Sequence, residues 1–190
     1  MKRNNVKELY KNAFMYVGEV KNFVYLAMFI FLVGIIIGFV FYQNFSFLND
    51  FLKELGLRAG NLSFVEMFLF ILQNNLSVSF TVLVSGALLG FIPILMVLFN
   101  GIILGYVSRL LVENNIGGSL WQLLPHGIFE LPAAFISAGL GIHLGMFILY
   151  RDSVKELKNR IYNSFNAFLF IVFPLLVIAA IIESILMFVL

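Results

Sequence analysis

The sequence contains no cysteine, which excludes disulfide bonds, thiolate metal sites and a cysteine nucleophile. Charge is also scarce, because only 12% of the 190 residues are Asp, Glu, Lys or Arg and the formal net charge is +2. A soluble domain carries about a quarter charged residues, and a nucleic-acid-binding protein needs a concentrated basic surface. We therefore expect neither a soluble globular domain nor a nucleic-acid partner.

Apolar residues are correspondingly abundant. They make up 62% of the chain, the mean hydropathy is +1.01, and uncharged runs of about 18 residues or more recur, each long enough to cross a ~30 Å hydrocarbon layer. These runs predict an all-α integral membrane protein, multi-pass in the plasma membrane. We expect one membrane domain over residues 1–190, with about five transmembrane helices and short interfacial helices. The first apolar run lacks a cleavage motif and is expected to stay as an anchor.

Breaks in the apolar runs place the elements. We expect a polar loop at 43–63, a short interfacial helix at 63–73 ended by Asn74-Asn75, and a tight turn at Pro93, since proline ends the helix that it interrupts. Arg151, Lys155, Lys158 and Arg160 predict a basic loop before the last crossing. The five crossings are expected near 23–42, 75–92, 94–112, 126–150 and 165–189.

Residues 1–21 precede the helical bundle of 22–190 as an amphipathic segment. Val6, Tyr10, Phe14 and Val17 recur at helical spacing, which suits a helix lying on the membrane with its apolar side down. A lead-in helix that packs on the rest of the protein fits the same pattern equally well.

The basic residues predict the orientation. Five precede the first crossing and four lie between the fourth and fifth, whereas only Lys53, Arg58 and Arg109 fall on the other side. By the positive-inside rule, the N-terminus is cytoplasmic and the C-terminus external.

Glycines spaced four apart recur in the crossings. Small residues at this spacing let helix backbones approach closely, so we expect these faces to pack helices. There are more such faces than one five-helix bundle needs, and we therefore expect a homodimer. The glycines are Gly34, Gly38, Gly86, Gly90, Gly101, Gly105, Gly141 and Gly145.

His126 and Glu130 lie four residues apart in an apolar segment, where a buried ionisable side chain is costly unless it is paired. With Glu66 and Glu183, they fall in the outer half of the membrane under the predicted topology. Such a set could bind a divalent cation or relay protons. Alternatively, Glu66 and Glu183 are solvated at the interface, while His126 and Glu130 bond each other or free backbone groups. Whether a metal binds stays open.

The motifs of metalloproteases, serine hydrolases and phosphate-binding loops are all missing from the sequence. We therefore expect no enzyme and no cofactor, with an intramembrane metal-dependent hydrolase kept as an alternative.

The stretch Pro125-His126-Gly127-Ile128-Phe129-Glu130-Leu131-Pro132 resembles the signature of the stage II sporulation protein M family. The resemblance covers about 60–150, and its motif positions are Asn75, Asn100, Pro125, His126, Gly127, Glu130 and Pro132. In spore-forming bacteria this family implies a non-enzymatic membrane component of an engulfment complex, partnered with wall-degrading enzymes. We accordingly expect a membrane scaffold that recruits other membrane or envelope proteins. The alternative is a small dimeric transporter or ion- or proton-conducting protein that uses His126 and Glu130.

Overall fold

The computed structural model describes residues 6–59, 62–88, 90–114 and 123–189, which are helical apart from short connections. Within this part of the chain, five helices are long and apolar enough to cross a membrane. They confirm the predicted all-α membrane class with about five crossings. The spans are Lys21–Val40, Phe64–Ser85, Ile92–Glu113, Gly127–Leu149 and Ser153–Phe188.

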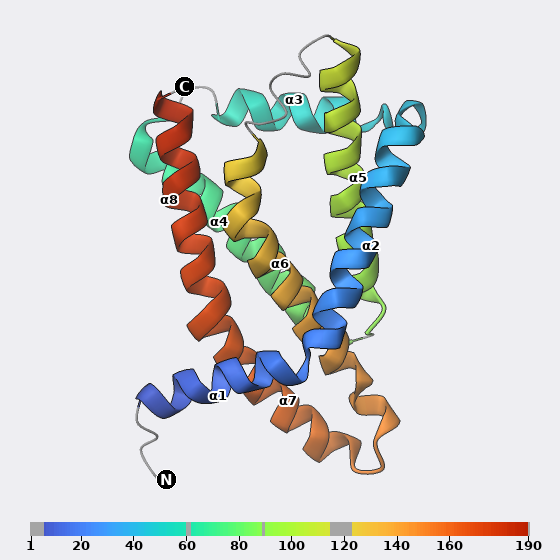
Figure 1. The fold of residues 1–190 in the computed structure, drawn as a ribbon, viewed down its shortest axis with the longest axis vertical. Helices are drawn as coiled ribbons and strands as arrows, with labels where there is room; N and C mark the ends of the chain where they lie inside the picture. Colours follow the sequence, from blue (N-terminus) through green and yellow to red (C-terminus); the bar gives the residue numbers. More distant parts are fainter. Residues whose placement is uncertain (1–5, 60–61, 89, 115–122, 190) are drawn as a thin grey trace.

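The elements follow one another as in Figure 1. In chain order they are α1 (Val6–Glu19), α2 (Lys21–Val40), the 3-10 turn η1 (Tyr42–Phe45), α3 (Leu48–Ala59), α4 (Phe64–Ser85), α5 (Ile92–Glu113), α6 (Leu123–Gly145), the 3-10 turn η3 (Met146–Leu149), α7 (Ser153–Ala167), the π-helical turn η4 (Phe168–Val172) and α8 (Phe173–Val189).

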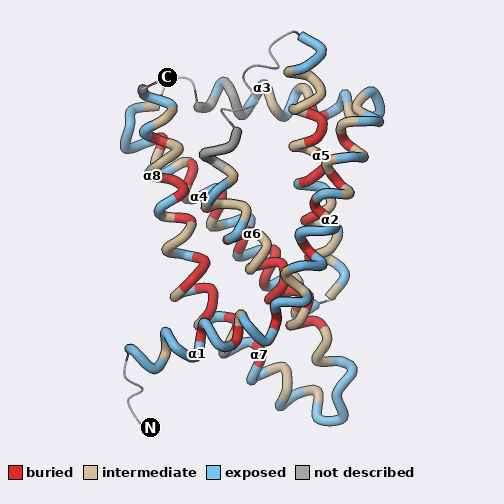
Figure 2. Tube along the Cα trace, in the orientation of Figure 1, coloured by how far each residue is buried: buried red, intermediate tan, exposed pale blue. Residues whose placement is uncertain are grey.

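The spanning helices form two groups. Helices α2 and α5 pack as a pair, and α4, α6 and α8 pack as a group of three. Helix α6 joins the groups because it also packs on α2. Half of its span is buried, against 22–33% for the other four spans. Figure 2 shows that buried residues gather where α6 crosses its neighbours, while the outer faces stay exposed.

Helices α2 and α5 touch through their backbones. A Cβ added to Gly34 would lie 3.1 Å from the Gly101 Cα, and one added to Gly105 would lie 2.9 Å from the Ile35 Cα. A Cβ on Gly38 would overlap the carbonyl oxygen of Ile102. The glycine face predicted on each helix is therefore confirmed as a packing face.

The remaining glycine pairs join the turn after α4 to α6. A Cβ on Gly86 would overlap the Gly141 carbonyl oxygen, and one on Gly90 would lie 3.2 Å from the Gly145 Cα. Contacts within one chain thus occupy every glycine pair from which a homodimer was expected. The excess of glycine faces was the reason for that expectation, and this reason is wrong. The homodimer itself stays a prediction that needs a different surface.

The predicted break at Asn74-Asn75 is wrong. Residues 63–73 and 75–92 do not form two elements, because α4 runs unbroken from Phe64 to Ser85. Asn75 is 7% exposed, so its side chain packs inside the bundle and does not end the helix. The chain turns only after Ser85, and Pro93 lies in the first turn of α5, where a missing N–H costs nothing.

The predicted basic loop before the last crossing is also wrong. It is the helix α7, which begins after Asp152, whose side chain accepts from the Lys155 backbone N–H at 3.4 Å. Helix α7 continues through η4 into α8, and the chain bends there (Figure 1). Pro174 has no N–H to donate to the carbonyl of Phe170, so a regular α-helix would lose one backbone hydrogen bond here. The wider π-helical turn η4 lies at this point and accommodates the loss.

Helices α1 and α7 lie across one end of the bundle, and α3 lies across the opposite end (Figure 1). The predicted N-terminal helix is confirmed, and it packs on α7. Its buried residues are Ala13 and Tyr16, whereas Tyr10 and Phe14 of the predicted apolar stripe are exposed. Packing on the protein therefore uses one face of α1. Contact of the other face with lipid stays a prediction.

Candidate polar sites of the bundle

The family-like segment lies in α6, whose first residues are Leu123 to His126. Glu130 is half-buried there and Pro132 is exposed inside the helix. Because proline has no N–H, the carbonyl of Ile128 lacks its α-helical donor on this face. The side chain of His126 lies outside the described part of the structure, so its expected contact with Glu130 stays a prediction.

Glu66 has a structural role at the start of α4. Its Oε2 accepts hydrogen bonds from the Ser63 backbone N–H at 2.9 Å and from Ser63 Oγ at 2.6 Å. This is a capping box, which satisfies backbone donors that a helix start leaves free. Glu66 is exposed, so the structure accounts for this carboxylate by helix capping, without a ligand.

The other predicted site residues lie on different helices and differ in burial. Glu183 is half-buried on α8, Asn75 is buried on α4, and Asn100 is exposed on α5. Among the residues that the structure describes, no three His, Asp or Glu side chains are placed to hold one metal ion. The polar site expected in the outer half of the membrane therefore stays a prediction, and its described members do not by themselves form a three-ligand metal site.

A buried polar cluster that the sequence did not predict joins α1, α6 and α7. At its centre Arg160 is 3% exposed. Its Nε donates to Glu156 Oε1 at 2.8 Å, one turn earlier on α7. Its Nη1 donates to the backbone carbonyl of His143, in the last turn of α6. A cation at that end complements the partial negative charge of the helix terminus.

The ring of His143 completes the cluster. Its Nδ1 and the Tyr16 Oη share a hydrogen bond of 3.1 Å, which ties α1 to α6. The Phe23 ring lies 5.3 Å from the His143 ring, and the Tyr150 ring stacks 4.7 Å from the Arg160 guanidinium. Burial raises the pKa of the Tyr16 phenol, which keeps this hydroxyl protonated and able to donate.

This cluster, called the α1–α6–α7 junction below, holds Arg160 through its carboxylate, carbonyl and aromatic contacts. Breaking these contacts is costly, because it would leave a buried guanidinium without its partners. The contacts fix α1 and α7 relative to α6. Its signal in the sequence is a stripe of Leu157, Arg160 and Ser164 at helical spacing, in which polar residues stand at core positions.

A second, smaller group of polar and aromatic contacts lies at the α3 end. The Arg109 guanidinium lies 5.0 Å from the Tyr42 ring and 5.5 Å from the Phe39 ring. The Tyr42 hydroxyl donates to Glu113 Oε1 at 2.8 Å, and the Tyr106 hydroxyl donates to Asn49 Oδ1 at 2.6 Å. These contacts tie the loop side of α2 and the start of α3 to α5.

The sequence of this chain is similar to known proteins over most of its length. Residues 27–186 match the family model described as stage II sporulation protein M. An uncharacterized protein of Methanocaldococcus jannaschii is 34% identical over 165 residues, which are 83% of this chain and 89% of that protein. A second uncharacterized protein of the same organism is 33% identical over 110 residues, 58% of this chain and 46% of that protein. No solved structure matches the chain.

Proposed function

Because this chain belongs to the stage II sporulation protein M family, we propose that it is a non-enzymatic scaffold that holds partner proteins at one face of the cell membrane. The proposal joins two statements. The chain is a membrane protein with five apolar helices, and the resemblance noted from its signature implies recruitment of other proteins and no catalysis.

The observation that carries the proposal is the α1–α6–α7 junction. It fixes two helices across one end of the bundle through a buried guanidinium. The outward positions of α7 stay exposed, among them Lys155 and Lys158. A surface that is rigid before binding loses little entropy when a partner docks, so a fixed platform suits recruitment.

We propose that this platform, formed by α1 and α7, lies on the cytoplasmic side of the plasma membrane. Lys7 and Lys11 on α1 are at the same end as Lys155 and Lys158 on α7, whereas Lys53 on α3 is at the opposite end (Figure 1). This segregation supports the positive-inside orientation.

Single cysteines at Lys158 and Lys53 test the orientation, because the chain has no other cysteine. An impermeant maleimide added to intact cells should label the cysteine at Lys53 and leave that at Lys158 unlabelled until the cells are opened. Labelling of both residues in intact cells would refute the five-crossing orientation.

Photo-crosslinking tests the scaffold. A photoreactive amino acid at Lys158 in the native cell membrane should give discrete protein adducts, identified by mass and confirmed by reciprocal purification. The same group at Leu95, exposed on the apolar face of α5, should give lipid adducts. A second copy of the chain would show as an adduct of twice the 21.5 kDa mass. Protein adducts at neither position would overturn the scaffold proposal.

Glu130 distinguishes the scaffold from the alternative of a transporter or proton-conducting protein. Glu130→Gln keeps the size and hydrogen-bonding capacity of the side chain but removes its titration. A scaffold should keep its Lys158 adducts and complement a deletion strain with this variant. A folded variant that keeps the adducts but fails to complement would favour ion or proton handling.

A further inference from the structure

An open groove runs along the surface where the start of α2 faces the first half of α6. Its volume is about 480 Å³, within the range of about 300–1,000 Å³ typical of small-molecule sites. Apart from Lys21 and Tyr25 its walls are apolar, and include Val24 and Met28 on α2 with Leu131 and Pro132 on α6. The groove therefore offers an open apolar surface to long apolar molecules.

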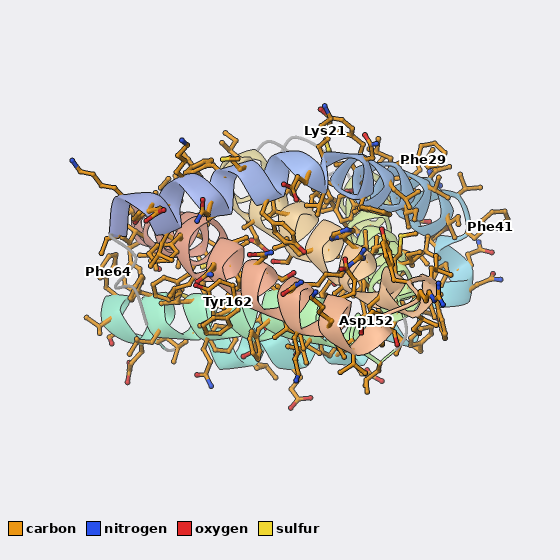
Figure 3. All side chains as sticks on the ribbon, turned by 90° about the horizontal axis from the view of Figure 1, so that it is seen from below. Lys21, Phe29, Phe41, Phe64, Asp152 and Tyr162 are labelled. Carbon is orange, nitrogen blue, oxygen red and sulfur yellow. The ribbon has the colours of Figure 1, made fainter. Side chains whose placement is uncertain are left out.

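The groove carries a positive charge at one end. Lys21 lines it at the first residue of the α2 span, where the chain leaves α1. Figure 3 shows the Lys21 side chain pointing away from the bundle at this elbow. Tyr25, one turn further, is 62% exposed and also lines the groove. A cation and an aromatic ring at the end of a span are the residues that anchor at the headgroup level.

An apolar groove on a spanning helix pair is surrounded by lipid, and unfilled gaps forfeit dispersion contacts along their walls. A flexible hydrocarbon chain can fill such an irregular shape. The lysine adds attraction for a phosphate, since basic residues near anionic lipid contribute about 1 kcal/mol each. Neutral lipid would gain the apolar contacts but lack this attraction.

We propose that this groove is a binding site for one anionic phospholipid, with an acyl chain between α2 and α6 and the phosphate on Lys21. The site lies beside the α1–α6–α7 junction, because Val17 of α1 also lines it. A bound lipid would thus contact α1, α2 and α6 together. The proposal is independent of the scaffold function and stands or falls by lipid binding alone.

Contact quenching of a fluorophore tests the site. Met28, which is 40% exposed in the groove, is replaced by cysteine, labelled, and reconstituted into phosphatidylcholine vesicles. Brominated phosphatidylglycerol or brominated phosphatidylcholine is then added at increasing mole fraction. We expect half-maximal quenching at an about fivefold lower fraction of the anionic lipid, the ratio that one lysine contributes.

A label at Leu95→Cys is the positional control. The contact of Gly34 with Gly101 sets the register of α2 and α5, and it places Met28 and Leu95 at the same level. Leu95 is 53% exposed and lies outside the groove, so both brominated lipids should quench its label equally.

Two lysine variants identify the source of the preference. Lys21→Gln in the Met28→Cys background should abolish the fivefold ratio, whereas Lys158→Gln, which removes an exposed charge from α7, should leave it unchanged. Equal quenching by the two lipids at Met28, or a preference that survives Lys21→Gln, would overturn the proposal. A label that neither lipid quenches would show that protein fills the groove, and would overturn it too.

Discussion

Helices α2 and α5 are held by backbone against backbone, whereas α1, α6 and α7 meet through charged and aromatic side chains. The first contact lies within two spans and uses Gly34, Gly38, Gly101 and Gly105. The second lies at the end of the bundle and buries Arg160. In hydrocarbon no water is present to form a hydrogen bond with an unpaired polar group, so helices there associate by close packing. At the end of the bundle water can solvate the charged partners until they meet, and a buried ion pair becomes possible.

The largest effect is expected for Gly38→Ala. The new methyl group would overlap the Ile102 carbonyl oxygen and lie 2.9 Å from the Ile102 Cα, and backbone cannot move aside as a side chain can. We expect a loss of about 3 kcal/mol in the free energy of unfolding, the upper part of the range for overpacking. Equilibrium unfolding in mixed micelles measures it. A variant as stable as the parent would mean that the α2–α5 contact is looser than described.

Arg160→Leu tests the other contact. The variant keeps an apolar stem but leaves Glu156 and the His143 carbonyl without their cation. Because the Glu156 side chain is 31% exposed and can reach water, we expect a loss of about 3 kcal/mol, the low end for a broken buried ion pair. Lys158→Leu, on an exposed position of the same helix, is the matched control and should change stability by less than about 0.5 kcal/mol. Equal effects of the two variants would contradict the junction.

Tyr16→Phe removes one hydrogen bond from the junction and keeps the ring. The His143 Nδ1 would lose its partner at 3.1 Å, which should cost about 1 kcal/mol. For a chain of this length, that lowers the melting temperature by roughly 2–4 °C. Thermal unfolding in detergent measures the shift. The double variant with Arg160→Leu should lose less than the sum of the two, since both act on one cluster.

The smallest effect, with the opposite sign, is expected for Gly18→Ala. This glycine lies in α1, and a Cβ there would meet no atom within 4 Å. Alanine restricts the unfolded chain and favours the helix, so stability should rise by about 0.4–1 kcal/mol. The same micelle assay compares it with Gly38→Ala. A loss of stability would show that the exposed side of α1 is covered in the membrane protein.

Much of the fold was predictable because membrane-spanning segments must be long and apolar, and hydropathy measures this property directly. The spans α2, α5 and α6 lie within a few residues of the predicted crossings, and the glycine faces were predicted as packing faces. Hydropathy failed to predict that α7 is a packed helix. Its buried positions are occupied by Arg160 and Ser164, and polar residues lower the hydropathy that would indicate a buried face. Hydropathy also failed at α4 because Asn75 is polar yet lies in the middle of a helix, with its side chain buried in the bundle.

The polar site was predicted less well, for a related reason. Sequence spacing identifies ionisable residues in apolar segments, but it does not say which partner each one meets. Glu66 meets Ser63, three residues away, and this local capping pattern was available in the sequence. Arg160 meets the backbone of His143 on another helix, and a backbone carbonyl leaves no mark in a sequence.

The docking of α1 on α6 and α7 has a consequence for biosynthesis. Tyr16 and His143 are 127 residues apart, so at about 5–20 residues per second the ribosome needs roughly 6–25 s to supply the partner of the first helix. During that interval α7, the helix on which α1 mainly packs, has not yet been made. We expect the exposed stripe of α1, with Phe14 62% and Val6 59% accessible, to hold the nascent segment on the membrane surface. The contact of α1 with α6 and α7 therefore forms only after these later helices have been made.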